Sequence, residues 1–169
     1  MKWLTVLVIA FAIVASVVAA LLYAAGGSAA QSAGDLKIPT GYRSWLHVNT
    51  LVIDKASPLF PALGGMHNVY INSTGEPALK KGGPYPDGST FVTDLHAVTV
   101  SDGSYAEGAR KAIVIMVKDS KQTSTGGWVW QAWAGGDQSK PLVTDAVKQC
   151  FECHQPKKEH DYVYSTYIP

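Results

Sequence analysis

Two cysteines and a histidine near the end of the chain are the residues best suited to do chemistry. Cys150 and Cys153 are separated by two residues, and His154 follows at once. In this spacing each thiol can add across a vinyl group of a porphyrin, and the adjacent imidazole can ligate the iron from one face. Two thioether bonds tie the backbone to the ring edge and leave His154 little freedom under the metal. The motif therefore predicts one covalently attached haem c, with His154 as the iron ligand.

Three other chemistries are open to the same residues. A structural zinc site normally needs four ligands, so His154 and His160 would have to complete the two cysteines. A thioredoxin-like redox pair is expected beside a βαβ pattern, whereas this pair follows a strand-rich region. A simple disulfide gives no reason for the histidine that follows. Haem attachment accounts for both cysteines and for the histidine, so it is the preferred interpretation.

The N-terminus predicts where this chemistry takes place. Residues 3–25 carry no charge, and as a helix they would span about 34 Å, enough for a bilayer core. A secretory signal has a shorter apolar centre, although Ser28-Ala29-Ala30 resembles a cleavage site. We expect a transmembrane anchor, or alternatively a signal segment, over residues 1–25. Lys2 favours the N-terminus inside, and both interpretations put the remainder on the periplasmic side, where c-type haem is attached.

The remainder of the chain has the length of one domain with a single core. Residues 26–40 are predicted as a flexible linker, because their first part is rich in Gly, Ala and Ser. The haem domain is expected over residues 41–169. A formal net charge of +1 gives no reason to expect nucleic acid as a partner. The expected partners are a membrane, through the N-terminal helix, and a redox protein.

β-branched and aromatic residues predict a mainly β (α+β) domain. The segments expected as strands are residues 45–53, 67–72, 89–100, 111–118 and 128–133, with Gly, Pro, Asn and Asp turn signals between them. Residues 141–149 are predicted as a short helix that leads into the cysteines. The expected architecture is a twisted antiparallel sheet with a few short helices and a C-terminal haem motif, preceded by one N-terminal transmembrane helix.

Several short motifs occur along the domain in a specific order and spacing. They are Tyr42-Arg43-x-Trp45, Val69-Tyr70-Ile71-Asn72, Lys80-Lys81-Gly82, Asp87-Gly88-Ser89, Met116-Val117-Lys118-Asp119-Ser120, Gly127-Trp128 and Asp161-Tyr162-Val163-Tyr164. In these motifs the chain resembles the cytochrome P-460 family, which includes the β-sheet cytochromes c′-β. The resemblance implies a twisted antiparallel sheet, a possible homodimer, and a mostly five-coordinate haem open to small gaseous or nitrogenous ligands such as nitric oxide.

Some members of that family oxidise hydroxylamine or nitric oxide and carry a lysine cross-linked to the porphyrin. The resemblance aligns this lysine with Thr93, a few residues after the Asp87-Gly88-Ser89 turn. Threonine has no amine and cannot form the bond. We therefore expect a membrane-anchored cytochrome that binds small ligands and undergoes one-electron redox chemistry. An oxidoreductase acting on hydroxylamine or nitric oxide stays an alternative, as does a six-coordinate electron-transfer or accessory subunit of a membrane complex.

Aromatic and histidine side chains are the candidates for the distal side of the iron. Phe60, Phe91 and Trp45 are able to cap the iron, although aromatic residues more often fill a sheet core. His67 and His96 are able to bond a distal ligand or to ligate iron. Each lies in an alternating strand, where a histidine more often faces solvent or makes a structural bond.

Further polar and sulfur-containing residues have two interpretations each. Met66 or Met116 can supply a thioether as sixth ligand, or can pack in the core. Arg43 can pair with a haem propionate through its planar fork, or can hold the sheet edge. Asp94 and Asp145 are speculative candidates for proton transfer in an enzyme.

Overall fold

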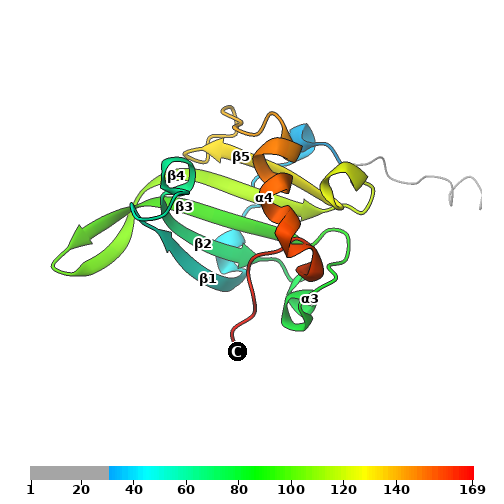
Figure 1. Cartoon of the computed structure of the whole chain (residues 1–169), viewed down its shortest axis with the longest axis horizontal. Coiled ribbons are helices and arrows are strands. Elements are labelled where there is room, and N and C mark those ends of the chain that lie inside the picture. Colours follow the sequence, from blue (N-terminus) through cyan, green and yellow to red (C-terminus); the bar gives the residue numbers. More distant parts are fainter. Residues whose placement is uncertain (1–30) are drawn as a thin grey trace, which may run out of the picture. The chain divides into compact units, whose positions relative to one another are not determined.

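A five-stranded antiparallel β-sheet organises residues 31–169, the part of the chain that the computed structural model describes (Figure 1). The strands follow one another across the sheet in chain order. They are β1 (Leu46–Ile53), β2 (Gly65–Ile71), β3 (Thr90–Ser101), β4 (Ser104–Lys118) and β5 (Trp128–Ala134). This arrangement confirms the predicted mainly β class with an antiparallel sheet.

Short helices connect and cover the strands, as predicted. Before the motif they are η1 (Ala33–Asp35), η2 (Tyr42–Ser44), α2 (Phe60–Leu63), α3 (Glu76–Lys81) and η3 (Thr123–Thr125). A π-helical turn η4 (Val147–Phe151), the short α4 (Glu152–His154) and the 3-10 helix η5 (Gln155–His160) then follow without a break. We call these last three elements together the motif helix.

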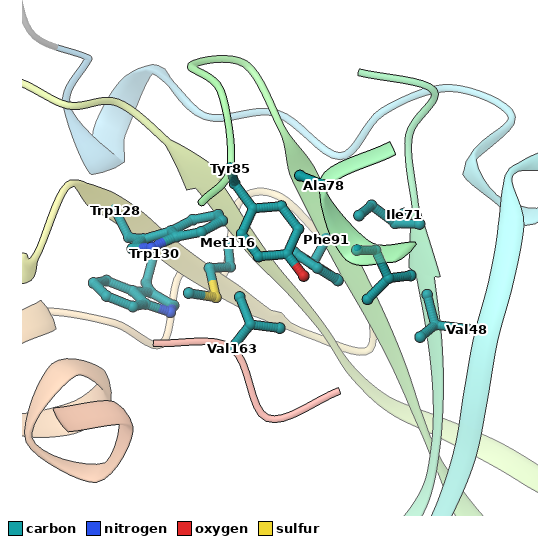
Figure 2. Close-up of a cluster of buried hydrophobic side chains, with 10 residues drawn as sticks. Val48, Ile71, Ala78, Tyr85, Phe91, Met116, Trp128, Trp130 and Val163 are labelled. Atoms are coloured by element: carbon teal, nitrogen blue, oxygen red, sulfur yellow. The ribbon is translucent and has the colours of Figure 1, made fainter. Parts of the chain in front are cut away.

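The two faces of the sheet bury separate cores, because successive side chains of a strand point to opposite sides. On β3, Phe91 belongs to one core and Val92 to the other. The core that contains Phe91, Met116 and Trp130 marks what we call the front face, and Figure 2 shows its packed side chains. The other core contains Val92, and it marks the back face.

The N-terminal part of the described chain packs on the back face. Leu36 is 3% exposed and Tyr42 is 8% exposed, and both lie in the back core. The backbone N–H of Gln31 donates to the carboxylate of Asp119 at 2.7 Å. The flexible linker predicted for residues 26–40 is described only from Gln31 onward, and in that part the chain is held against the domain.

The motif helix begins later than the predicted helix of residues 141–149, so that prediction is wrong in its position. Pro141 is not helical and pairs with Trp133 in an isolated bridge beside β5. The side-chain oxygen of Gln149 accepts hydrogen bonds from the backbone N–H groups of Thr144 and Asp145. These bonds satisfy donors just before the helix, which then runs through the cysteines and lies across the sheet in Figure 1.

Strand β4 is longer than predicted and begins at Ser104 instead of residue 111. Its first part pairs with the end of β3, for example Tyr105 with Val100, and forms a hairpin arm that extends beyond the other strands (Figure 1). Both of these side chains are exposed. The arm was missed because residues that bury neither face leave no apolar alternation to detect.

The predicted transmembrane anchor over residues 1–25 lies outside the described residues and stays a prediction. Within residues 31–169, no helix is both long and apolar enough to cross a bilayer.

Candidate haem site

The two motif cysteines lie one helical turn apart. Cys150 is half-buried and packs against the front core, whereas Cys153 is exposed. Helical residues three apart are neighbours on one side of the helix, so both free thiols can reach one edge of a planar group. Burial, with a smaller effect of Cys153, raises the pKa of Cys150 to about 11. The Cys150 thiol therefore stays protonated at neutral pH.

The imidazole of His154 is held in one tautomer. Its Nδ1 lies 2.7 Å from the backbone carbonyl oxygen of Tyr162, which can only accept. Nδ1 must therefore carry the proton, which leaves the lone pair on Nε2. Burial lowers the pKa of His154, although the bond to Tyr162 opposes this effect. Burial thus favours the neutral form of the ring, which is the form that binds a metal, and the bond to Tyr162 fixes its tautomer.

Two aromatic rings set the orientation of this imidazole. The Trp130 ring centroid lies 5.6 Å from that of His154, and the Tyr164 ring meets it edge-on at 5.2 Å. The Tyr164 hydroxyl donates to the backbone oxygen of Cys153 at 2.7 Å, which ties the C-terminal segment to the motif. His154 is therefore positioned by contacts from a strand and from the segment behind the motif helix.

A tight turn after the motif helix directs the Tyr162 carbonyl back toward His154. Asp161 and Tyr162 have φ values of 52° and 66°, which are uncommon for residues other than glycine. The Trp128 indole N–H donates to the Asp161 carbonyl at 2.9 Å. Gly126 has φ 65°, and a Cβ there would lie 2.5 Å from the Tyr162 ring. Only glycine lets this loop approach the turn so closely.

Beside the motif, the front face carries three half-buried and mostly apolar side chains, those of Val69, Thr93 and Val114, which we call the apolar bed. Val69, Thr93 and Val114 are partners in adjacent strands, and Thr93 points to the same face as Phe91 because it is two residues further along β3. The indole N–H of Trp130 is, among residues 31–169, a buried donor without a hydrogen-bond partner. Two free thiols, a pre-set imidazole and this bed fit a covalently attached haem.

Two of the predicted distal residues lie at the other end of the front face. Phe60 on α2 is 36% exposed and lines a cavity of about 660 Å³ together with Val98 and Tyr105. His67 points to the front face, two residues before Val69. Its Nε2 donates to the carbonyl of Leu63 at 2.6 Å, and burial lowers its pKa. The imidazole is thereby held against the end of α2.

Phe91 and Met116 have packing roles in the front core (Figure 2). Phe91 is 5% exposed, and its ring centroid lies 5.3 Å from Tyr85 and 6.2 Å from Trp128. Met116 is 7% exposed. The structure thus favours the core interpretation that the sequence had left open for both residues.

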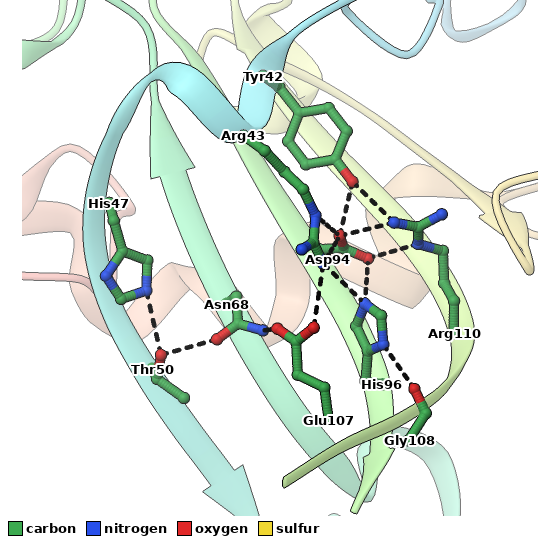
Figure 3. A network of polar contacts seen from close by, with 10 residues as sticks. All are labelled: Tyr42, Arg43, His47, Thr50, Asn68, Asp94, His96, Glu107, Gly108 and Arg110. Atoms are coloured by element: carbon green, nitrogen blue, oxygen red, sulfur yellow. Dashed lines mark hydrogen bonds and ion pairs between the residues drawn. The ribbon is translucent and has the colours of Figure 1, made fainter.

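The back face holds several residues that the sequence had offered as haem contacts. Figure 3 shows Arg43 and His96 bonded to Asp94, with nitrogen–oxygen distances of 2.7 Å and 2.8 Å. Met66 pairs with His96 in the sheet ladder, and Trp45 packs against the back core. The sheet separates these residues from the motif helix. Arg43 is therefore not brought to the motif, and its fork binds a carboxylate of the protein itself.

Asp94 is the centre of a structural ion network (Figure 3). It is 0% exposed and also accepts hydrogen bonds from Arg110 at 2.7 Å and Tyr42 at 2.6 Å. Burial alone would raise the pKa of Asp94, but the bonds from Arg110, Tyr42 and Arg43 outweigh it and hold the pKa well below its ordinary value. Asp145, the other proposed proton carrier, accepts a bond from the backbone of Lys148 where the motif helix begins.

Sequence reasoning missed the carbonyl acceptor at Tyr162 and the ring contact from Trp130. A backbone acceptor leaves no mark on residue types, so only the Asp161-Tyr162-Val163-Tyr164 motif signalled that this segment matters. The aromatic pattern of residues 128–133 predicted a strand correctly, but it did not predict which of its rings would meet the histidine.

Comparison with known proteins yields one family. The family model for cytochrome P460 matches residues 39–165, which covers all five strands and the motif helix. No curated protein matches the chain. The chain belongs to the cytochrome P460 family, and it is a haem-binding cytochrome whose haem c is covalently attached.

Proposed function

We propose that Cys150 and Cys153 form the thioether bonds and that His154 is the iron ligand. The support is the fixed Nδ1–H bond to Tyr162, which leaves Nε2 as the ring nitrogen with a free lone pair. Haem iron, when bound, exchanges one electron and can take a small ligand at an open axial position. The protein contributes a neutral imidazole, an apolar bed and a scaffold that fixes both.

We further propose that the second axial position is open. One observation carries this proposal: each side chain that the sequence suggested as a possible sixth ligand to the iron is held by other contacts in the protein. Met66 and His96 belong to the back face, and Met116 is packed in the front core. His67 uses its Nε2–H on the Leu63 carbonyl. A side chain committed elsewhere has to give up its own contacts before it can ligate iron.

The function supported best is binding of small ligands such as nitric oxide, coupled to one-electron redox chemistry. The front-face bed of Val69, Thr93 and Val114 presents methyl groups and one hydroxyl, without a charged group among them. A surface of this kind excludes water and favours small uncharged molecules over ions. The exposed Cys153 lies beside the half-buried His154, so electrons have a short route from the protein surface.

The test is an optical spectrum of the purified holoprotein, oxidised and reduced, with and without nitric oxide. We expect a high-spin, c-type spectrum that shifts when the gas is added. A His154→Ala variant should retain covalent haem and lose the native spectrum, whereas His67→Leu should keep the high-spin form. A low-spin spectrum blind to nitric oxide would overturn the open site and indicate an electron-transfer subunit.

Oxidation of hydroxylamine or nitric oxide is the second candidate function. The family membership keeps it open, whereas Thr93 supplies no amine for a porphyrin cross-link and Asp94 is committed on the back face. The assay is turnover of hydroxylamine with an electron acceptor, and we expect none above free haem peptide. Sustained turnover would make the protein an enzyme in spite of the threonine.

We also propose that residues 1–25 anchor the haem domain to a membrane, on the periplasmic side. The support is the uncharged run of residues 3–25, together with the need of c-type haem for attachment outside the cytoplasm. Fractionation of cells that express the full chain should recover haem with the membranes after an alkaline wash. Recovery of a shortened, soluble haem protein would indicate a cleaved signal.

A further inference from the structure

A largely buried ion pair lies next to the turn that contacts the candidate iron ligand, and neither of its residues takes part in haem attachment. The Lys118 ammonium, at the end of β4, lies 2.6 Å from the Asp161 carboxylate. Their side chains are only 11% and 13% exposed, unlike those of Lys140 and Asp137, which are 66% and 44% exposed. Lys118 also lies 5.0 Å from the centroid of the Trp128 ring. Burial of two charges costs hydration free energy, and only close contact between them and further hydrogen bonds can offset this cost.

Asp161 is fixed through its side chain and its backbone at once. One carboxylate oxygen binds Lys118, and the other accepts the backbone N–H of Tyr85 at 2.9 Å. Its own N–H donates to the Lys158 carbonyl at 3.0 Å, and its carbonyl accepts from Trp128. These contacts come from β4, from β5, from the motif helix and from the loop that carries Tyr85. Together they hold Asp161 at a positive φ, a backbone conformation that is costly for a residue other than glycine.

The next carbonyl along the chain is the acceptor for His154. The peptide that follows Asp161 leads into Tyr162, whose φ is also positive and whose carbonyl oxygen lies 2.7 Å from His154 Nδ1. The place of this carbonyl therefore follows from the place of Asp161. Lys118 has no contact with His154 in the described structure, so any influence that it has passes through the turn.

We propose that Lys118 and Asp161 are positioning residues for the iron ligand: their ion pair fixes the Tyr162 carbonyl against His154 and so sets how strongly the imidazole donates electrons to iron. This inference rests on the proposed role of His154 as the ligand. A partner that accepts the second N–H of a metal-bound imidazole raises the basicity of the ring. A firm bond to Tyr162 thus favours ferric over ferrous iron.

Loss of the ion pair shifts the midpoint potential in opposite directions, depending on whether Lys118 acts through its charge or by positioning the turn. If Lys118 matters only through its charge, its removal takes a positive charge from the region and favours ferric iron, which lowers the midpoint potential. If Lys118 acts by positioning, its removal loosens the turn, weakens the Tyr162 bond and raises the midpoint potential. The sign of the shift therefore separates the two effects.

The experiment compares Lys118→Met with the wild type as full-chain holoproteins, and Lys140→Met serves as the matched control. We expect Lys118→Met to raise the midpoint potential. Mutation of a residue that hydrogen-bonds to a metal ligand changes metal affinity by at least about tenfold. A tenfold change in the preference for ferrous over ferric iron corresponds to a shift of about 59 mV in the midpoint potential for one electron. Resonance Raman spectra of the ferrous protein should show the iron–imidazole stretch at lower frequency. Lys140→Met should leave both values unchanged.

A second variant, Lys118→Gln, has the same charge change but keeps a hydrogen-bond donor for Asp161. Its potential and stretching frequency should lie between those of the wild type and Lys118→Met, and it serves in place of the methionine variant if that protein does not fold. A fall in potential, or equal values for both variants, overturns the positioning role. A wild-type ferrous spectrum in which the iron–imidazole band is missing and His154→Ala changes nothing refutes the proposed ligand instead.

Discussion

Asp94 gives the sharpest test of how the domain is held together. Asp94 is 0% exposed. Its carboxylate accepts hydrogen bonds from two side-chain nitrogens of Arg43, from two of Arg110 and from the Tyr42 hydroxyl. Asp94→Asn preserves the shape of the side chain and removes its charge. The folded protein then keeps one acceptor oxygen in place of a carboxylate that served several charged donors.

The expected loss follows from the exposure of the partners. Breaking a fully buried ion pair destabilises a protein by about 3–5 kcal/mol. Here the side chains of Arg43 and Arg110 are 44% and 35% exposed, so water can hydrate the charges that lose their partner. We therefore expect the lower end, about 3 kcal/mol. For a domain of this size the unfolding midpoint should fall by roughly 10 °C.

The assay is thermal unfolding of the holoprotein at pH 7, followed by circular dichroism, with Asp137→Asn as the control. Asp137 forms an exposed ion pair with Lys140, and its loss should leave the midpoint nearly unchanged. The optical spectrum of the haem should be the same in all three proteins, because the sheet lies between Asp94 and the motif helix. An unfolding midpoint of Asp94→Asn within 2 °C of the wild type, taken as about 0.5 kcal/mol, would refute the reasoning.

The same group predicts the acid dependence of stability. The pKa of Asp94 is lower in the folded state than in the unfolded chain, where it is about 3.9. Its contribution is therefore fully present above that unfolded value, and it is lost as the pH falls below about 4 toward the folded pKa. The difference in stability between wild type and Asp94→Asn should shrink over this window. A difference that stays constant from pH 7 to pH 3 would contradict the linkage.

Three further predictions concern the two faces and the motif. Arg43→Met should lower the unfolding midpoint but leave the midpoint potential of the haem unchanged; a shifted potential would restore the propionate interpretation. In haem-free protein, iodoacetamide should modify Cys153 well before Cys150, because the latter thiol is half-buried and its pKa is raised to about 11; mass spectrometry of the peptides measures the order, and equal rates would contradict it. Gly126→Ala should destabilise the protein by about 1–3 kcal/mol in denaturant unfolding, because its Cβ would meet the Tyr162 ring at 2.5 Å at a positive φ. A fully stable variant would show that the turn can move.

The strands and the chemistry of the Cys150–His154 motif depend on residues close together in the chain, so the sequence alone predicts them. β-branched and aromatic segments bounded by turn signals predicted all five strands. The exposed start of β4 was not predicted, because residues from Ser104 to Arg110 bury neither face. The predicted helix of residues 141–149 failed for a related reason. A helical pattern in the local sequence does not reveal partners far along the chain, and Pro141 pairs with Trp133 beside β5 instead of starting a helix.

The sequence by itself determined the covalent chemistry, because the reach of two thiols and one imidazole depends on a spacing of a few residues. It also determined that Thr93 and Asp94 point to opposite faces, since strands alternate. Only the tertiary structure decided which face receives the motif helix, because that choice depends on packing between segments far apart in the chain. As a result, Thr93 lies on the same face of the sheet as the motif helix, Arg43 and Asp94 lie on the opposite face, and the Tyr162 carbonyl points toward His154.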